Sequence, residues 1–278
     1  MKMDVCNILN IKQHQLIKFN QILNEWNRKK RKNQLVLSSG SKSIDEILSG
    51  GFLSGKKYVI FGPNKTGKTQ ICHQLCVQVY NKLSKNQDQL TTKNMGFVYY
   101  FDTENTFRPE RIKDITIKFK LNYKKVLKSI YITKIMSNSA FLLALNDLEN
   151  ILDINYQKVL IIDSINNHFR SEQGDNTVSY QKSKELFLKI LEKIDSLTKK
   201  FNLITIVTAQ VAPNLIKKAI IQVLPVGNYF INFFFSEYIY LNLKEEGLCY
   251  AHIVNSNTNQ EKKLVYKITS AGIQDHKI

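Results

Sequence analysis

A glycine-containing segment, "GPNKTGKT", has the residue types and spacing that bind phosphate groups. It follows the apolar run "KYVIF" and opens a stretch with helical periodicity, so we expect a loop that joins a buried strand to a helix N-terminus. Backbone N–H groups in such a loop attract anions, the Lys68 ammonium can reach the β- and γ-phosphates of a nucleotide, and the Thr69 hydroxyl can hold Mg²⁺. The pattern therefore predicts a nucleotide site formed by Gly62, Pro63, Asn64, Lys65, Thr66, Gly67, Lys68 and Thr69.

Acidic residues end two further apolar runs. The run "KVLII" carries Asp163 to the carboxyl end of an expected buried strand, which is where open α/β sheets bind their ligands. A carboxylate there can hold the hydration shell of Mg²⁺, although the same residue type also caps helices and turns. The segment "YYFDTE" places Asp102 and Glu104 at the end of another strand. We expect Glu104 to orient and polarise an attacking water in nucleotide hydrolysis, with a salt-bridge role as the alternative.

These residues need a scaffold in which strand ends meet. Short β-branched or aromatic runs alternate with longer amphipathic stretches; the runs are "KYVIFG", "MGFVYYFDTE", "SIYITKI", "KVLIIDSI" and "LITIVTAQ". Near-continuous apolar strands separated by helices imply a parallel sheet covered on both faces. After residue 233 the expected strands are joined by short polar turns; they are "FFSEYIYLNL", "CYAHIVNS" and "LVYKITSAG". We therefore predict an α/β fold with a mostly parallel sheet, helices on both faces and an antiparallel C-terminal edge.

Composition limits the classes of partner and compartment. The 278 residues include 40 Lys and Arg against 23 Asp and Glu, and the net charge of +17 favours nucleic acid or another polyanion, unless it reflects mutational drift in an AT-rich genome. The cysteines, Cys6, Cys72, Cys76 and Cys249, lack disulfide or metal-site spacing, which favours a reducing compartment. No segment has signal-peptide or membrane-span character, so we expect a protein that is not secreted and has no membrane partner. The histidines are scattered and predict no metal site.

The first 36 residues differ from the rest of the chain. Apolar residues from Leu16 to Trp26 have helical spacing, and the basic run "NRKKRKNQ" follows them. The basic run is either a solvated linker or a nucleic-acid contact that could also act as a nuclear address. We therefore expect a short N-terminal helix and basic linker over residues 1–36 and a nucleotide-binding core over residues 37–278. The expected location is the nucleus for a eukaryotic source and otherwise the cytoplasm.

A series of segments resembles the RecA/RadA recombinase family. In chain order these are "LSSGSKSIDEILSGGF", "FGPNKTGKTQ", "FDTENTFRPERI", "KVLIIDSINNHFRSE", "TAQV", "LPVGNYF" and "YKITSAGIQD". The chain looks most like archaeal RadA and its eukaryotic counterparts, from about Leu37 to Asp275. The resemblance implies a RecA-like P-loop ATPase core that binds ATP with Mg²⁺ and assembles as a filament or ring. Such a protein binds single-stranded DNA and pairs it with double-stranded DNA in homologous recombination and repair.

The resemblance also implies roles at the ATP site. Glu104 resembles the family's catalytic glutamate, and Lys68 is also assigned to catalysis. Gln70 follows the phosphate loop as it does in the family, and Arg111 resembles the arginine that packs on adenine. Gln210, in "TAQV", resembles the glutamine that links the nucleotide state to a DNA-binding loop, so it is also assigned to catalysis.

Implied DNA contacts come from two loops. Arg170 resembles a DNA contact at the start of the first loop, and Lys182 stands where a second basic residue would be. The residues from Pro213 to Pro225 resemble the second loop, in which Lys217 and Lys218 can meet phosphates. The loop is otherwise apolar, and its side chains could contact bases or a partner protein.

Departures from the family pattern leave alternative functions open. The residues before Leu37 are too few for the helical N-terminal DNA-binding domain of the relatives, and "FNQI" has isoleucine where the polymerisation motif has alanine. The family's Gly-Arg-Gly in the first loop aligns with "DNT", residues 175–177. These departures favour a non-filamentous accessory paralogue that uses ATP as a binding switch and acts on another recombinase. An ATPase of the same fold with other substrates is the third alternative.

Overall fold

The computed structural model describes residues 34–84, 97–154, 156–174, 179–216, 219–245, 247–257 and 259–276. The chain divides into two units, Met1–Leu35 and Val36–Ile278, and the strands and helices of the described residues belong to the second. The expected N-terminal helix, "FNQI", "DNT", Lys217 and Lys218 lie outside the described residues.

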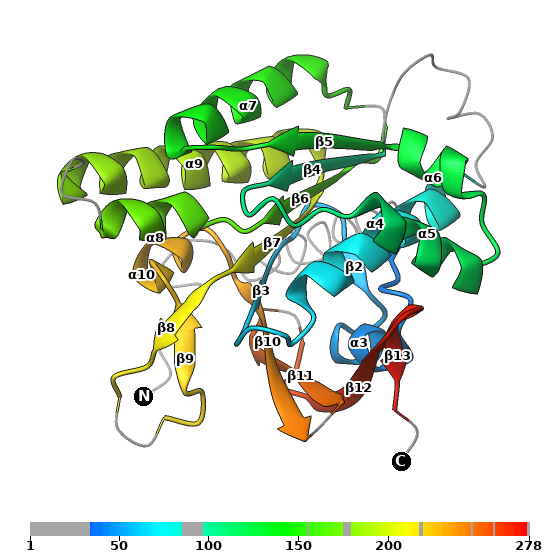
Figure 1. The fold of residues 1–278 in the computed structure, drawn as a ribbon. Coiled ribbons are helices and arrows are strands. Elements are labelled where there is room, and N and C mark those ends of the chain that lie inside the picture. Colours follow the sequence, from blue (N-terminus) through cyan, green and yellow to red (C-terminus); the bar gives the residue numbers. More distant parts are fainter. Residues whose placement is uncertain are drawn as a thin grey trace, which may run out of the picture. The chain divides into compact units, whose positions relative to one another are not determined.

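A nine-stranded sheet forms the centre of the second unit, in the order β13-β12-β11-β10-β3-β7-β6-β4-β5 (Figure 1). Its parallel part consists of β10 (Glu237–Glu245), β3 (Lys57–Phe61), β7 (Ile204–Ala209), β6 (Val159–Asp163), β4 (Val98–Asp102) and β5 (Ile130–Lys134). The antiparallel part adds β11 (Leu248–Asn255), β12 (Lys263–Thr269) and β13 (Gly272–Asp275). The sheet confirms the predicted α/β fold and its antiparallel C-terminal edge. The sequence pattern does not separate β13 from β12.

Helices cover both faces of the parallel strands, as predicted (Figure 1). Helices α7 (Asn138–Ile151) and α9 (Tyr180–Phe201) pack on one face; α4 (Lys68–Leu83) contacts β6 and β7 on the other, with α5 (Pro109–Lys118) and α6 (Tyr123–Lys128) against it. Because side chains alternate along a strand, Val59 and Phe61 share the core of α7 and α9. The short helices are α3 (Lys42–Ile47), α8 (Asn167–Gln173) and α10 (Asn228–Ile231). No helix in the described ranges is long and apolar enough to span a membrane.

Local sequence explains where α9, the longest helix of the described residues, begins and ends. In α9 the Ser179 hydroxyl caps the N-terminus by accepting from the Lys182 N–H group, and Asn202 ends the helix in the left-handed conformation. Buried residues recur every three or four positions between these ends. In α4, Cys72 and Cys76 are buried free thiols.

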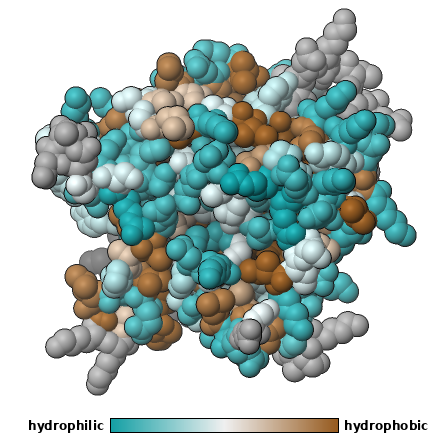
Figure 2. All heavy atoms as spheres, viewed as in Figure 1, coloured by the Kyte–Doolittle hydropathy of each residue, from teal (hydrophilic) through white to brown (hydrophobic). Residues whose placement is uncertain are grey.

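The segment from Pro213 to Pro225, expected as a loop, has a short β-ribbon at its base. Strands β8 (Val211–Pro213) and β9 (Val223–Pro225) pair antiparallel, with Ala212 opposite Leu224. Beyond the paired residues, Leu215 is 92% exposed and Ile220 is 89% exposed. Figure 2 shows apolar surface over this ribbon at the lower left. A second small hairpin joins β1 (Val36–Leu37) to β2 (Phe52–Leu53).

Candidate functional site

The segment Gly62–Thr69 forms a tight connection from β3 to α4. Gly62 has a φ of +150°, and a Cβ atom there would lie 1.9 Å from the Leu241 carbonyl oxygen of β10. Only glycine fits, because a side chain would collide with the backbone of the neighbouring strand. At the other end Gly67 is the N-cap of α4, with a φ of 88°. The two glycines let the chain turn from the strand into the helix beside β10.

The Lys68 ammonium lies within this loop. Its Nζ atom donates to the carbonyl oxygens of Gly62 at 2.8 Å and Pro63 at 2.9 Å. Burial lowers the pKa of Lys68, and the nearby carboxylates of Asp163 and Glu104 act in the opposite direction. A partly desolvated cation attracts phosphate more strongly than a fully hydrated one, because the local dielectric is low.

Pro63 and Thr66 shape the loop from outside the cavity. The Thr66 hydroxyl donates to the Pro63 carbonyl oxygen at 2.8 Å. The Tyr266 hydroxyl of β12 donates to the Thr66 carbonyl oxygen at 2.6 Å. The C-terminal strands therefore hold the phosphate loop in place.

The start of α4 fits a phosphate group with Mg²⁺. Among the hydrogen bonds of the described residues, the backbone N–H groups from Asn64 to Lys68 have no protein acceptor. Together with the Lys68 ammonium they form a donor set that suits phosphate oxygens. Thr69 Oγ1 lies 2.8 Å from Asp163 Oδ2, so a hydroxyl and a carboxylate meet at this point. Both are oxygen groups of the kind that hold Mg²⁺ directly or through its waters.

Asp163 ends β6 and is 2% exposed. Its Oδ2 atom accepts hydrogen bonds from the hydroxyls of Thr69 at 2.8 Å, Tyr100 at 2.9 Å and Thr106 at 3.3 Å, and its Oδ1 atom accepts from Thr208. Burial and the neighbouring Asp163 charge raise the pKa of Tyr100 well above its usual value, so this phenol remains a donor. The hydroxyls stabilise the buried carboxylate and hold one of its oxygens toward Thr69.

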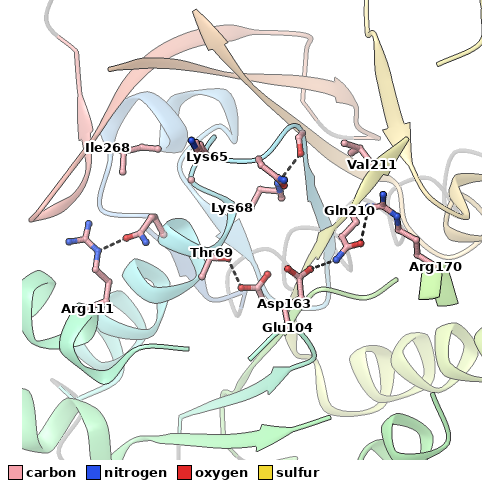
Figure 3. Close-up of a pocket in the computed structure, with 14 residues that line it drawn as sticks. Lys65, Lys68, Thr69, Glu104, Arg111, Asp163, Arg170, Gln210, Val211 and Ile268 are labelled. Carbon is pink, nitrogen blue, oxygen red and sulfur yellow. Dashed lines mark hydrogen bonds between the residues drawn. The ribbon is translucent and has the colours of Figure 1, made fainter. Parts of the chain in front are cut away.

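Glu104, Gln210 and Arg170 form a hydrogen-bonded row on another side of the site (Figure 3). Gln210 Nε2 donates to Glu104 Oε1 at 2.9 Å, and Arg170 Nη1 donates to Gln210 Oε1 at 3.0 Å. The Ser164 hydroxyl donates to the same Glu104 oxygen at 2.5 Å. Within the described part of the chain the Glu104 side chain makes these two hydrogen bonds and no ion pair.

One cavity of about 760 Å³ connects these groups. It is lined by Gly62, Asn64, Lys65, Gly67, Lys68, Thr69, Gln70, Glu104, Arg111, Asp163, Arg170, Gln210, Val211 and Ile268. The Arg111 guanidinium donates to Gln70 Oε1 and to the carbonyl oxygens of Thr269 and Ser270. These bonds hold the guanidinium plane in one orientation at the cavity wall, where it can stack on a flat ring.

Comparison with known proteins identifies the family. The Rad51 family model matches residues 30–276 of this chain. The chain belongs to the Rad51 family. The DNA repair protein Rad51 homolog of Drosophila melanogaster is 32% identical over 188 residues, which are 66% of this chain and 53% of that protein. The chain thus spans about half of that relative's length, and the predicted resemblance to RecA/RadA recombinases is confirmed.

In this Rad51-family chain most residues predicted for the nucleotide site line the same cavity. Pro63 and Thr66 do not line it and instead hold the loop. Arg170, which the resemblance assigns to DNA, lines the cavity and contacts Gln210. Lys182 is exposed in the first turn of α9 and is not part of the cavity lining.

Several residues at this Rad51-family site are not predicted from the sequence. Val211 and Ile268 line the cavity, and Tyr100 and Thr208 bind Asp163. A signal exists for Thr208, because a hydroxyl in the buried run "LITIVTAQ" needs a hydrogen-bond partner. The position of Ile268 depends on the order of the C-terminal strands, which local sequence does not specify.

His73 has a packing role beside the site. It is buried in α4, and burial lowers its pKa to about 4, so the ring is neutral at pH 7. Its Nδ1 atom lies 2.9 Å from the Thr69 carbonyl oxygen, and Nε2 accepts from the Arg108 N–H group at 3.0 Å. These partners require the proton on Nδ1. The described ranges contain no cluster of His, Cys, Asp and Glu that could hold a metal ion.

Proposed function

We propose that this chain binds ATP with Mg²⁺, hydrolyses the bond to the γ-phosphate, and uses that cycle to control contact with DNA in homologous recombination and repair. The observation that carries the proposal is the position of Gln210. Its side chain bonds Glu104 in the cavity, and the next residue, Val211, begins the β8–β9 ribbon. One residue therefore touches both the expected site of hydrolysis and the root of the expected DNA-binding loop. The Drosophila relative is named a DNA repair protein, which agrees with this role.

ATP binding is assigned to the loop, α4 and Arg111. The backbone N–H groups at the start of α4 would bind phosphate oxygens, and Lys68 would exchange its loop carbonyl partners for the β- and γ-phosphates. Thr69 and Asp163 would hold Mg²⁺, which when bound neutralises developing charge on the phosphates. Arg111, fixed by Gln70, would stack on the adenine.

Hydrolysis is assigned to three residues, Glu104, Lys68 and Gln210. Glu104 lies in the turn after β4, close to the carboxyl end of β6, where Asp163 and Ser164 lie. A carboxylate there can accept a proton from water and orient it toward the γ-phosphate. Gln210 donates to that carboxylate, so its position affects how available Glu104 is to water.

DNA contact is assigned to Arg170, Lys182, Lys217 and Lys218 and to the ribbon. The net charge of +17 favours phosphate binding, and exposed Leu215 at the ribbon can contact bases. The proposed partners are single-stranded DNA, double-stranded DNA, and either further copies of this chain in a filament or ring or another recombinase. The nucleotide-binding core is assigned to residues 37–278. The expected location is the nucleus for a eukaryotic source and otherwise the cytoplasm.

ATP hydrolysis with and without single-stranded DNA tests the proposal. Lys68→Ala should abolish tight ATP binding, because it removes ground-state contacts to the phosphates. Glu104→Gln should bind ATP like the wild type and hydrolyse it about 100-fold more slowly, because it acts on the water. Equal hydrolysis by the wild type and Glu104→Gln would remove Glu104 from the mechanism.

The salt dependence of DNA binding tests the electrostatic part separately. Each neutralised phosphate on a single strand contributes about −0.7 to the slope of log K against log salt, so four basic side chains predict about −2.8. A slope near zero would refute DNA binding by this chain.

An accessory role is the second candidate, and the apolar ribbon favours it. Leu215, Ile216 and Ile220 are 92%, 70% and 89% exposed, and apolar side chains of this kind also suit a protein partner. In that role ATP would switch binding to another recombinase without filament formation. Electron microscopy with ATP and single-stranded DNA separates the two: continuous filaments reject the accessory role, and their absence with a retained ATP-dependent partner complex supports it.

A further inference from the structure

The Asn166 side chain ties together the two ends of the β8–β9 ribbon. It is fully buried, at 0% exposure. Its Oδ1 atom accepts from the Gln210 N–H group at 2.8 Å, and its Nδ2 group donates at 2.9 Å to the carbonyl oxygens of Gln210 and Val226. The Val226 N–H group also donates to the Gln210 carbonyl oxygen at 2.9 Å. Gln210 precedes β8 and Val226 follows β9, so one carboxamide fixes both roots of the ribbon.

The neighbouring Asn167 determines which way the Gln210 side chain faces. Asn167 Nδ2 donates to the Thr103 carbonyl oxygen at 2.7 Å, and that partner can only accept. Asn167 Oδ1 must then point the other way, where Gln210 Nε2 lies at 2.9 Å. Gln210 therefore presents its NH₂ group toward Asn167 and Glu104, and its carbonyl oxygen toward Arg170. The orientation of the Gln210 amide therefore follows, through Asn167, from the fixed backbone carbonyl of Thr103, the residue before Glu104.

The same arrangement restrains Glu104. An amide NH₂ group has two hydrogens, and the acceptors of Gln210 Nε2 are Glu104 Oε1 and Asn167 Oδ1. Glu104 Oε1 also accepts from Ser164, so this oxygen already has two donors. A carboxylate oxygen offers about two lone-pair directions, so Oε1 has none left for a water, and the two bonds fix the direction in which Oε2 points. As long as Asn167 holds Gln210 in this position, Glu104 is restrained.

From these contacts we infer that Asn167 is a positioning residue that restrains hydrolysis through Gln210 and Glu104, and that Asn166 connects this restraint to the ribbon. The inference rests on the proposed function of the cavity. Asn166 and the Val226 N–H group bond the Gln210 backbone at the root of the ribbon, so a displacement of the ribbon that breaks these bonds, as DNA bound there would produce, also moves Gln210. Gln210 then leaves Glu104, and the carboxylate becomes available to water.

Two substitutions at Asn167 test the restraint. The residue is only half-buried and does not line the nucleotide cavity, so the fold and ATP affinity should be retained. In Asn167→Ala, Gln210 loses one of its two acceptors, and hydrolysis without DNA should rise about fivefold, the effect of one net hydrogen bond. The rate with single-stranded oligo(dT) should not change, so the stimulation ratio falls by the same factor.

Asn167→Asp should act in the same direction. It has no NH₂ group for the Thr103 carbonyl oxygen, which can only accept, so its second carboxylate oxygen is repelled there and the side chain no longer holds Gln210 in place. Hydrolysis without DNA should again rise, and the rate with oligo(dT) should again be unchanged. A purely structural role would lower both rates together in both variants. The control is Asn232→Ala, at the exposed C-cap asparagine of α10, which has no role assigned in the site.

The measurements are kcat and KM for ATP with and without oligo(dT), the Kd of a fluorescent ATP analogue, and the melting temperature. An unchanged stimulation ratio in Asn167→Ala, or parallel loss of both rates in both variants, overturns the role of Asn167 alone. A wild type without DNA-stimulated hydrolysis refutes the proposed function and this inference with it. A rise in hydrolysis without DNA in both variants, at unchanged Kd and at an unchanged rate with oligo(dT), supports it.

Discussion

Two buried tyrosines allow the contribution of a hydroxyl bound to Asp163 to be measured. The Tyr100 hydroxyl donates to Asp163 Oδ2 at 2.9 Å and is fully buried. Tyr238 is 3% exposed, and its hydroxyl has no hydrogen-bond partner among the described residues. Burial raises the pKa of both phenols, so both are neutral at pH 7. Substitution by phenylalanine removes one oxygen from each and keeps the ring.

The expected changes in the free energy of unfolding differ in sign. In Tyr100→Phe a buried carboxylate loses one charge-assisted hydrogen bond, worth about 1.5–3 kcal/mol. Because Asp163 keeps its threonine donors, we expect a loss of about 2 kcal/mol, equivalent to a melting temperature lower by about 4–8 °C for a domain of this size. In Tyr238→Phe an unsatisfied buried hydroxyl disappears, so the stability should be unchanged or higher by about 1 kcal/mol.

Urea denaturation followed by circular dichroism measures both values, without ATP or Mg²⁺ so that only folding contributes. The slopes against urea should match the wild type, because neither change alters the surface exposed on unfolding. Equal losses in the two variants would show that ring packing, rather than the bond to Asp163, explains the effect of Tyr100→Phe. A neutral Tyr100→Phe would show that the remaining hydroxyls satisfy Asp163 without it.

Three further predictions concern the loop, the turn after β4 and pH. Gly62→Ala should prevent folding or lower the melting temperature sharply, since its Cβ would lie 1.9 Å from the Leu241 carbonyl oxygen, whereas Gly174→Ala should be tolerated because its closest contact is 3.6 Å. Asp102→Asn should cost about 2 kcal/mol in urea denaturation and slow hydrolysis, because an NH₂ group would face backbone N–H donors of the turn that carries Glu104, the proposed general base. With a folded pKa of about 4, below the unfolded value of 6.5, His73 binds its proton more readily in the unfolded state, so stability falls by about 2 kcal/mol from pH 7 to pH 5. His73→Gln should remove that part of the pH dependence, and an unchanged profile would contradict it.

The parallel sheet and the strand-end chemistry could be predicted because both depend on local sequence. Apolar runs of strand length end directly at Asp102 and Asp163, and parallel strands place their carboxyl ends at one edge of a sheet. The structure pairs these two aspartates across β4 and β6. Glu104 follows within two residues of that edge, so its proximity to Asp163 required only that the two strands be neighbours.

The ribbon could not be predicted in the same way. The residues after Gln210 are mostly apolar and lack the alternation that marks a half-buried strand. Their pairing depends on Asn166, which is the N-cap residue of α8 and binds both roots of the ribbon. In the sequence Asn166 looks like an ordinary polar residue after "DSI", because its partners are far along the chain. Long-range polar contacts of this kind leave no periodic pattern.

Arg170 shows why residue type and motif position leave a role undecided. As a basic residue on α8, it has the chemistry of a DNA contact, yet Nη1 donates to Gln210 and the side chain lines the proposed nucleotide cavity. The amide of Gln210 is a neutral acceptor, so the bond is weaker than one to a phosphate. A phosphate within reach, whether of the nucleotide or of DNA at the ribbon, would compete for Arg170. Its departure would free the Gln210 carbonyl oxygen, and with it one of the contacts that hold the amide beside Glu104.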